Sequence, residues 1–80
     1  MNPVIENALK FYGDHHQPVG GFLRTCLEND LVGAIMRADE QNLKDLRDIM
    51  LYINWELSSE SWGSKKIVEA WLVVEEDMPV

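Results

Sequence analysis

The longest clean helical period in this chain runs from Asn42 to Leu57, with the sequence NLKDLRDIMLYINWEL. Within it, large apolar residues recur at alternating steps of three and four positions. Because an α-helix turns by about 100° per residue, this spacing places them on one stripe of a helix. The sequence therefore predicts a central helix, Leu43–Leu57, that packs on the rest of the chain through Leu43, Leu46, Met50, Ile53 and Leu57.

A shorter helical pattern occupies residues 1–13. Asn2 is suited to cap its start, and Pro3 fits the first helical position. Gly13 is suited to end it in a left-handed turn, which leaves residues 14–18 as a polar connection. Its predicted apolar face consists of Ile5, Ala8, Leu9 and Tyr12.

Residues 20–38 contain two further apolar faces. The first comprises Phe22, Leu23, Cys26 and Leu27, and the second comprises Leu31, Ala34, Ile35 and Ala38. Asn29-Asp30 between them is typical of a break, with Asn29 ending one helix and Asp30 capping the next. The alternative is one continuous helix from Gly20 to Ala38.

A final helix is predicted from Lys65 to Val74, with Ser64 as its cap and residues 75–80 as a frayed tail. Its apolar face consists of Ile67, Val68, Trp71 and Leu72. No run shows the two-residue alternation of a strand. The predicted fold is all-α: a compact bundle of four to five short helices around Leu43–Leu57, forming a single domain over residues 1–80.

Size and charge limit the function classes. An 80-residue chain that is 46% hydrophobic can form a core, but a small one that a homodimer would supplement. A net charge of −7 argues against direct binding to nucleic acid and is compatible with a basic protein surface, although it also serves solubility alone. We find neither a signal peptide nor a membrane segment, and the single cysteine, Cys26, suits a reducing cytoplasm.

Candidate catalytic chemistry is sparse. His15 and His16 are adjacent, so their side chains diverge, and Cys26 falls on an apolar face without a metal-binding spacing. We therefore expect no metal, no cofactor and no enzymatic activity. The remote alternative is a small metal- or thiol-dependent enzyme that uses these three residues.

A second apolar feature lies off the central stripe. Leu51 and Trp55 occupy nearly the opposite side of the central helix, in the same sector as Lys44 and Asp48. Either another helix of the chain covers them, or they contact a partner or a second copy. We predict the contact between chains. Trp62 is a further candidate, as an exposed anchor or as a plug at the end of the bundle.

Four short sequence motifs occur in order between residues 13 and 72: PxGGFL, LxNDL, RADxxN and WGSxxxVxxWL. Together they resemble a family of small bacteriophage and prophage proteins. The resemblance implies a phage accessory protein in the bacterial cytoplasm and no known activity or cofactor. The expected function is to bind and inhibit or redirect a host protein, with CRISPR or restriction systems among the candidate targets. The alternative is a dimeric regulator of phage transcription or replication.

Overall fold

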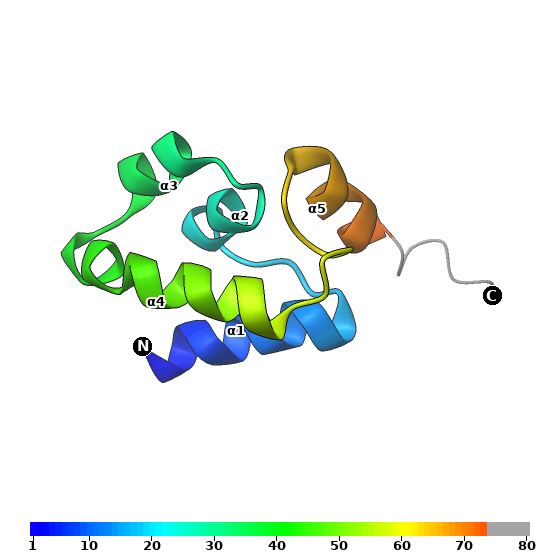
Figure 1. Cartoon of the computed structure of the whole chain (residues 1–80), viewed down its shortest axis with the longest axis horizontal. Helices are drawn as coiled ribbons and strands as arrows, with labels where there is room; N and C mark the ends of the chain where they lie inside the picture. The colour runs from blue at the N-terminus through cyan, green and yellow to red at the C-terminus, as the bar shows by residue number, and fades with distance from the viewer. Residues whose placement is uncertain (74–80) are drawn as a thin grey trace.

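The computed structural model describes residues 1–73, which form an all-α compact globule of five helices without strands. The helices are α1 (Pro3–His15), α2 (Gly21–Leu27), α3 (Leu31–Arg37), α4 (Glu40–Glu56) and α5 (Lys65–Val73). In Figure 1, α1 and α4 lie side by side and run in the same direction, and α2, α3 and α5 lie over one side of this pair. The all-α prediction is confirmed. Val74 and the predicted tail at 75–80 lie outside the described residues.

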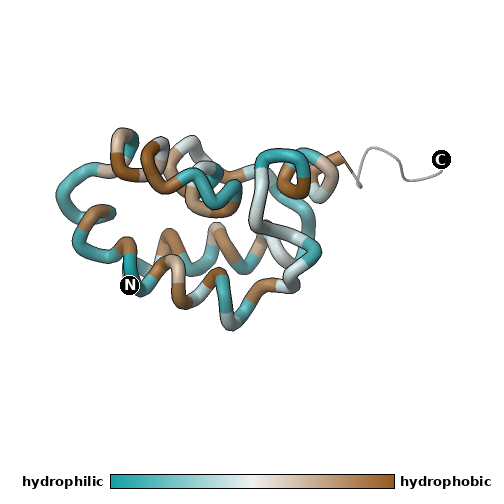
Figure 2. The backbone as a smooth tube through the Cα atoms, turned by 45° about the horizontal axis from the view of Figure 1, so that its top comes forward, coloured by the Kyte–Doolittle hydropathy of each residue, from teal (hydrophilic) through white to brown (hydrophobic). Residues whose placement is uncertain are grey.

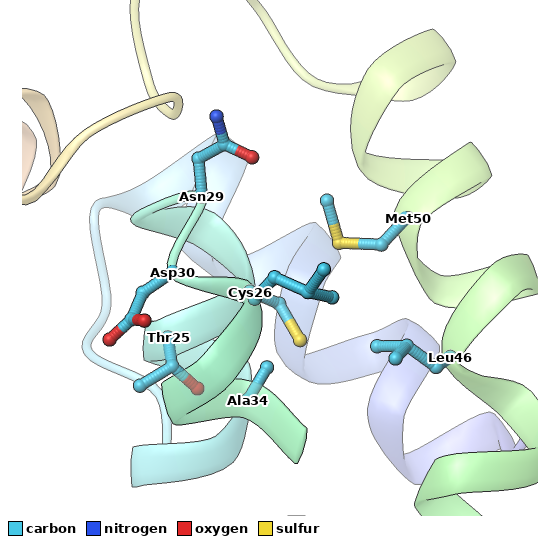
Figure 3. A pocket seen from close by; sticks show the side chains of 8 residues that line it. Thr25, Cys26, Asn29, Asp30, Ala34, Leu46 and Met50 are labelled. Carbon is cyan, nitrogen blue, oxygen red and sulfur yellow. The ribbon is translucent and has the colours of Figure 1, made fainter. Parts of the chain in front are cut away.

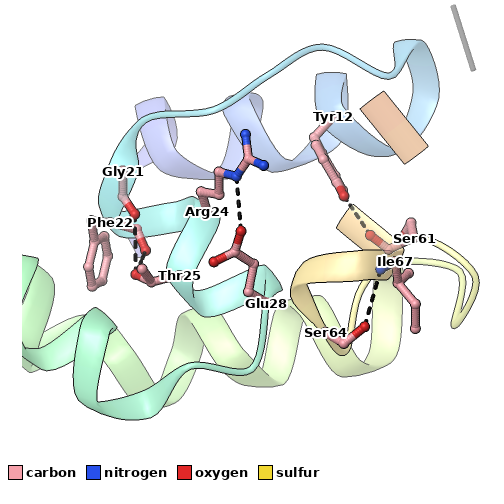
Figure 4. A network of polar contacts seen from close by, with 9 residues as sticks. All are labelled: Tyr12, Gly21, Phe22, Arg24, Thr25, Glu28, Ser61, Ser64 and Ile67. Carbon is pink, nitrogen blue, oxygen red and sulfur yellow. Dashed lines mark hydrogen bonds and ion pairs between the residues drawn. The ribbon is translucent and has the colours of Figure 1, made fainter. Parts of the chain in front are cut away.

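Side-chain caps set the starts of four helices. Asn2 accepts a hydrogen bond from the Val4 amide, and Asp30 accepts one from the Gly33 amide. Asp39 caps α4 by accepting from the Asn42 amide, and Ser64 caps α5 by accepting from the Ile67 amide (Figure 4). Each bond satisfies an amide that the helix leaves without a partner. The caps Asn2, Asp30 and Ser64 are those that the sequence predicted, whereas α4 begins three residues before the predicted Leu43.

Asn29 has a left-handed backbone, with φ of 60°, and separates α2 from α3. The predicted break is confirmed, and the continuous helix over residues 20–38 is excluded. The predicted end of α1 at Gly13 is wrong. α1 continues through Asp14 and His15, and His16 takes the left-handed position with φ of 57°.

Gly13 serves close packing instead of capping. A Cβ at this position would lie 2.8 Å from Cδ2 of Leu57, so glycine lets the Leu57 side chain lie against α1 without a shift. This contact joins the carboxyl ends of the two long helices.

All five helices contribute to one buried core. Its members are Ile5, Leu9, Tyr12, Leu23, Cys26, Leu27, Ala34, Ile49, Ile53 and Val68. On α4 the most buried positions are Ile49 and Ile53, whereas Leu43 is exposed. The midpoint of the two isoleucines lies about 60° from the centre of the predicted stripe. The prediction that Leu43 packs in the core is wrong, because the core lies on the side of α4 that carries Ile49 and Ile53.

Polar contacts close the end of the bundle where α1 meets α5. The Tyr12 hydroxyl donates to the Ser61 carbonyl at 2.6 Å (Figure 4), and the Trp71 indole donates to the Tyr12 carbonyl at 2.8 Å. The ring of His16 stacks on that of Trp71 with centroids 4.0 Å apart. Burial raises the pKa of Tyr12 to about 12, so the hydroxyl stays protonated and can keep donating.

α3 departs furthest from the expected packing. Of the apolar face predicted there, Ala34 is buried, but Leu31 and Ile35 are exposed. The helix packs on α2 through its small residues, and its large side chains point away from the core. Of the predicted apolar face Leu31, Ala34, Ile35 and Ala38, only the side with Ala34 is therefore buried.

Candidate functional site

The outer face of α4, which we define by Leu51 and Trp55, is the candidate site. Trp55 is 75% exposed and Leu51 is 39% exposed, one helical turn apart. Their direction from the helix axis differs by about 160° from that of the buried pair Ile49 and Ile53. No other helix of residues 1–73 covers Trp55, so the explanation that the chain's own helices bury this pair is wrong for the indole ring.

Charged side chains adjoin the two apolar ones. Lys44 and Asp48 are exposed in the same sector, toward the amino end of α4. Within the described part of the chain, neither forms an ion pair; the pair found there joins Arg24 to Glu28 at 3.0 Å. The outer face therefore presents apolar side chains next to a cation and an anion that water alone solvates. Such a combination is typical of an interface anchor beside a polar rim.

Trp62, the fifth predicted site residue, lies in the loop between α4 and α5. Its side chain is half-buried and packs against the core. The next residue, Gly63, donates its amide to the Leu27 carbonyl at 2.8 Å, which ties this loop to α2. Trp62 thus has a structural role as a plug at the end of the bundle, and its part in a partner contact stays a prediction.

The three residues considered for metal or thiol chemistry are in different environments. His15 is exposed on α1 beside Phe11, with ring centroids 5.6 Å apart, while His16 Nδ1 lies 2.8 Å from the Trp71 carbonyl oxygen. Cys26 is buried, and burial raises the pKa of its thiol to about 11, so the thiolate is scarce at neutral pH. Among residues 1–73, no three His, Cys, Asp or Glu side chains are placed to hold a metal ion together.

Sequence reasoning missed two hollows in the surface. A polar one, formed by α2, α3 and α5, is lined by Gly21, Arg24, Thr25, Glu28, Arg37, Lys65 and Glu69. Its basic and acidic groups largely offset each other, and Figure 4 shows Arg24 already directed at Glu28. This arrangement gives little selectivity for an anion. No periodicity in the sequence signals the hollow, because its residues come from three separate helices.

The second hollow is apolar and small, with a volume of about 40 Å³. Leu31 and Ala34 of α3, Leu46 and Met50 of α4 and Cys26 of α2 line it. Figure 3 shows Leu46 and Met50 on the side opposite Cys26 and Ala34. Cofactor and drug-sized ligands need pockets of about 300–1,000 Å³, so this hollow has room only for a single small group.

Comparisons of the chain with protein-family models, with curated proteins and with solved structures each give no match. They therefore add no evidence for or against the resemblance to small phage proteins. No helix of the described residues is both long enough and apolar enough to cross a membrane.

Proposed function

We propose that this protein is a non-enzymatic binding module: a phage accessory protein that acts in the bacterial cytoplasm by occupying a host protein. The observation that carries the proposal is the exposure of Trp55 on the outer face of α4. A tryptophan that is 75% exposed leaves a large apolar ring in water without contributing to the core. CRISPR and restriction proteins are the target classes we consider first.

The energy available at this face supports a binding role. Tryptophan buries about 150–250 Å² when fully covered, so covering the exposed part of Trp55 is worth about 3–5 kcal/mol before the cost of association. Leu51 adds to the same contact. Aromatic residues of this kind dominate the binding energy in many interfaces, while their neighbours mainly exclude water.

The charge of the protein favours a particular kind of target. A net charge of −7 steers the chain toward surfaces rich in lysine and arginine and away from nucleic acid. Host proteins that bind nucleic acid present such surfaces. Occupying one would block the nucleic acid without any catalytic step. The high pKa of the Cys26 thiol and the different contacts of His15 and His16 fit a protein that works without catalysis.

Affinity capture from a bacterial lysate tests this proposal. We expect the wild type to retain a host protein in stoichiometric amount and Trp55→Ala to weaken the binding by about 2 kcal/mol or more, about 30-fold. Val73→Ala is the matched control, because Val73 is also an exposed apolar residue but lies on α5. Equal capture by Trp55→Ala and the wild type, with both folded, would rule out the outer face of α4 as the binding site.

A further inference from the structure

The outward side of α3 carries four of the eleven large hydrophobic residues that are exposed in residues 1–73. It consists of Leu31, Val32, Ile35 and Met36, which we call the α3 face. Val32 is 72% exposed and Met36 is 78% exposed. At about 100° per residue the four side chains fall within an arc of about 140°, and Ala34 lies on the buried side of the helix. In Figure 2 most of the α3 tube is brown or tan, whereas α4 alternates between brown and teal.

The α3 face carries no charge of its own. Positions 31–36 contain no charged residue. The Asp30 carboxylate, at the start of the helix, accepts the Gly33 amide at 2.9 Å. At the other end, the Arg37 side chain turns back toward α2, since its Cδ lies 3.5 Å from the place that a Cβ on Gly21 would occupy. Both flanking charges therefore have positions away from the apolar side chains.

The small apolar hollow extends this face toward α4. Leu31 belongs both to the α3 face and to the wall of the hollow, and Leu46 and Met50 form the opposite wall (Figure 3). Leu43, one turn before Leu46, is exposed on the same helix. The hollow has room for the tip of one apolar side chain, so a side chain of a partner can insert into it.

We propose that the α3 face binds a second copy of this chain in a two-fold symmetric dimer. Two copies that each carry −7 repel one another, so they associate most readily where neither brings a charged group to the contact. The α3 face offers a basic partner no acidic side chain to pair with, since positions 31–36 are uncharged. Homodimer interfaces are also more apolar than other interfaces, as this face is.

The α3 face supplies part of the area that a symmetric contact needs. Four side chains exposed to this extent offer about half of the ~800 Å² that each partner buries in a standard interface. Leu43 and the rim of the hollow extend the contact on α4. Under two-fold symmetry the same patch serves both copies, so every apolar side chain of the α3 face contributes twice. The dimer leaves Trp55, which projects from α4, for the host protein.

Sedimentation velocity of the purified protein over a range of concentrations tests the dimer, with Val32→Glu and Val4→Glu as matched variants. Both valines are the second residue of their helix, and their exposures are 72% and 73%. Glutamate is favourable in the first turn of a helix, so both variants should keep their fold, which circular dichroism checks. We expect Val32→Glu to raise the dimer dissociation constant by about 100-fold and Val4→Glu to leave it nearly unchanged.

The salt dependence of association distinguishes a second copy of the chain from a partner of opposite charge. Added NaCl screens the repulsion between two acidic chains, so the dimer should tighten as salt increases. A monomeric wild type at about 100 μM would overturn the proposal, because a dimer weaker than that has little relevance in a cell. Equal weakening by Val4→Glu and Val32→Glu would overturn it too, since the cause would then be charge alone. A dimer that loosens with salt, or that Trp55→Ala abolishes, would place the contact elsewhere.

Discussion

The outer face of α4 and the α3 face differ in how charge accompanies their apolar side chains. On α4, Leu51 and Trp55 share their sector with Lys44 and Asp48. On α3, six consecutive positions are uncharged and the flanking charges turn aside. A mixed surface selects a partner by its charges, whereas an uncharged one suits a copy of the same acidic chain. Exposure alone therefore does not say what a surface binds; the neighbouring charges indicate the partner.

The largest expected effect is a loss of stability, which a substitution in the core causes and one on either exposed surface does not. Replacing Ile53 with Ala should lower the free energy of unfolding by about 2–5 kcal/mol, because Ile53 is completely buried. Leu43→Ala on the same helix should cost less than about 1 kcal/mol, since Leu43 is exposed. Urea denaturation measures both. Equal losses would mean that the predicted stripe, and not the observed face, is the buried side of α4.

The Cys26 thiol tests whether the hollow beside the α3 face is closed to solvent. With its pKa raised from 9.0 to about 11, the native thiol should react with a disulfide reagent at mildly alkaline pH about 100-fold more slowly than in urea. Comparison with Val32→Glu then shows whether the second copy adds protection. A native rate equal to the unfolded rate would contradict the burial of this residue.

The same pKa shift predicts the direction of a pH dependence. Below pH 9 the thiol is protonated in both the folded and unfolded states, so it does not change the free energy of unfolding there. Between pH 9 and about 11 the unfolded chain ionises first, and the protein loses stability as pH rises. The urea midpoint of the wild type should therefore fall more steeply over this range than that of Cys26→Ala, which retains the other titrating groups. Parallel declines would exclude a contribution from Cys26.

The smallest expected effect concerns the charges beside Trp55. Lys44→Ala should weaken binding of the host protein by only about 0.5–1 kcal/mol, chiefly through a slower association rate that depends on salt. It should leave the dimer unaffected, because the α3 face contains no charge. Surface plasmon resonance against the captured partner measures the rate. A change in the dimer on Lys44→Ala would mean that the two surfaces are not separate.

The sequence was most informative where structure depends on local chemistry. Asn2, Asp30 and Ser64 were identifiable as caps because a cap needs only a suitable side chain beside the first amides of its helix. The break at Asn29-Asp30 follows from the same chemistry. In each case the residues that decide the outcome are within four positions of one another.

The sequence was least informative where structure depends on which side another helix approaches. Leu43 and Ile49 are both apolar, and only the packing of the other helices decides that Ile49 is buried. For α3 the period predicted an apolar face correctly, but nothing in the sequence indicates that the helix packs through Ala34 instead. Gly13 has the chemistry of a cap, yet contact with Leu57 determines its role. The pair Leu51 and Trp55 stood out because α4 is long enough to define its outer side.

Native mass spectrometry of the complex captured from lysate tests the separation of the two surfaces most directly. We expect the wild type to give two copies of the chain with two copies of one host protein. Val32→Glu should give one of each, and Trp55→Ala should give two copies of the chain without the host protein. Retention of the host protein by Trp55→Ala, or its loss in Val32→Glu, would contradict the assignment of one partner to each surface.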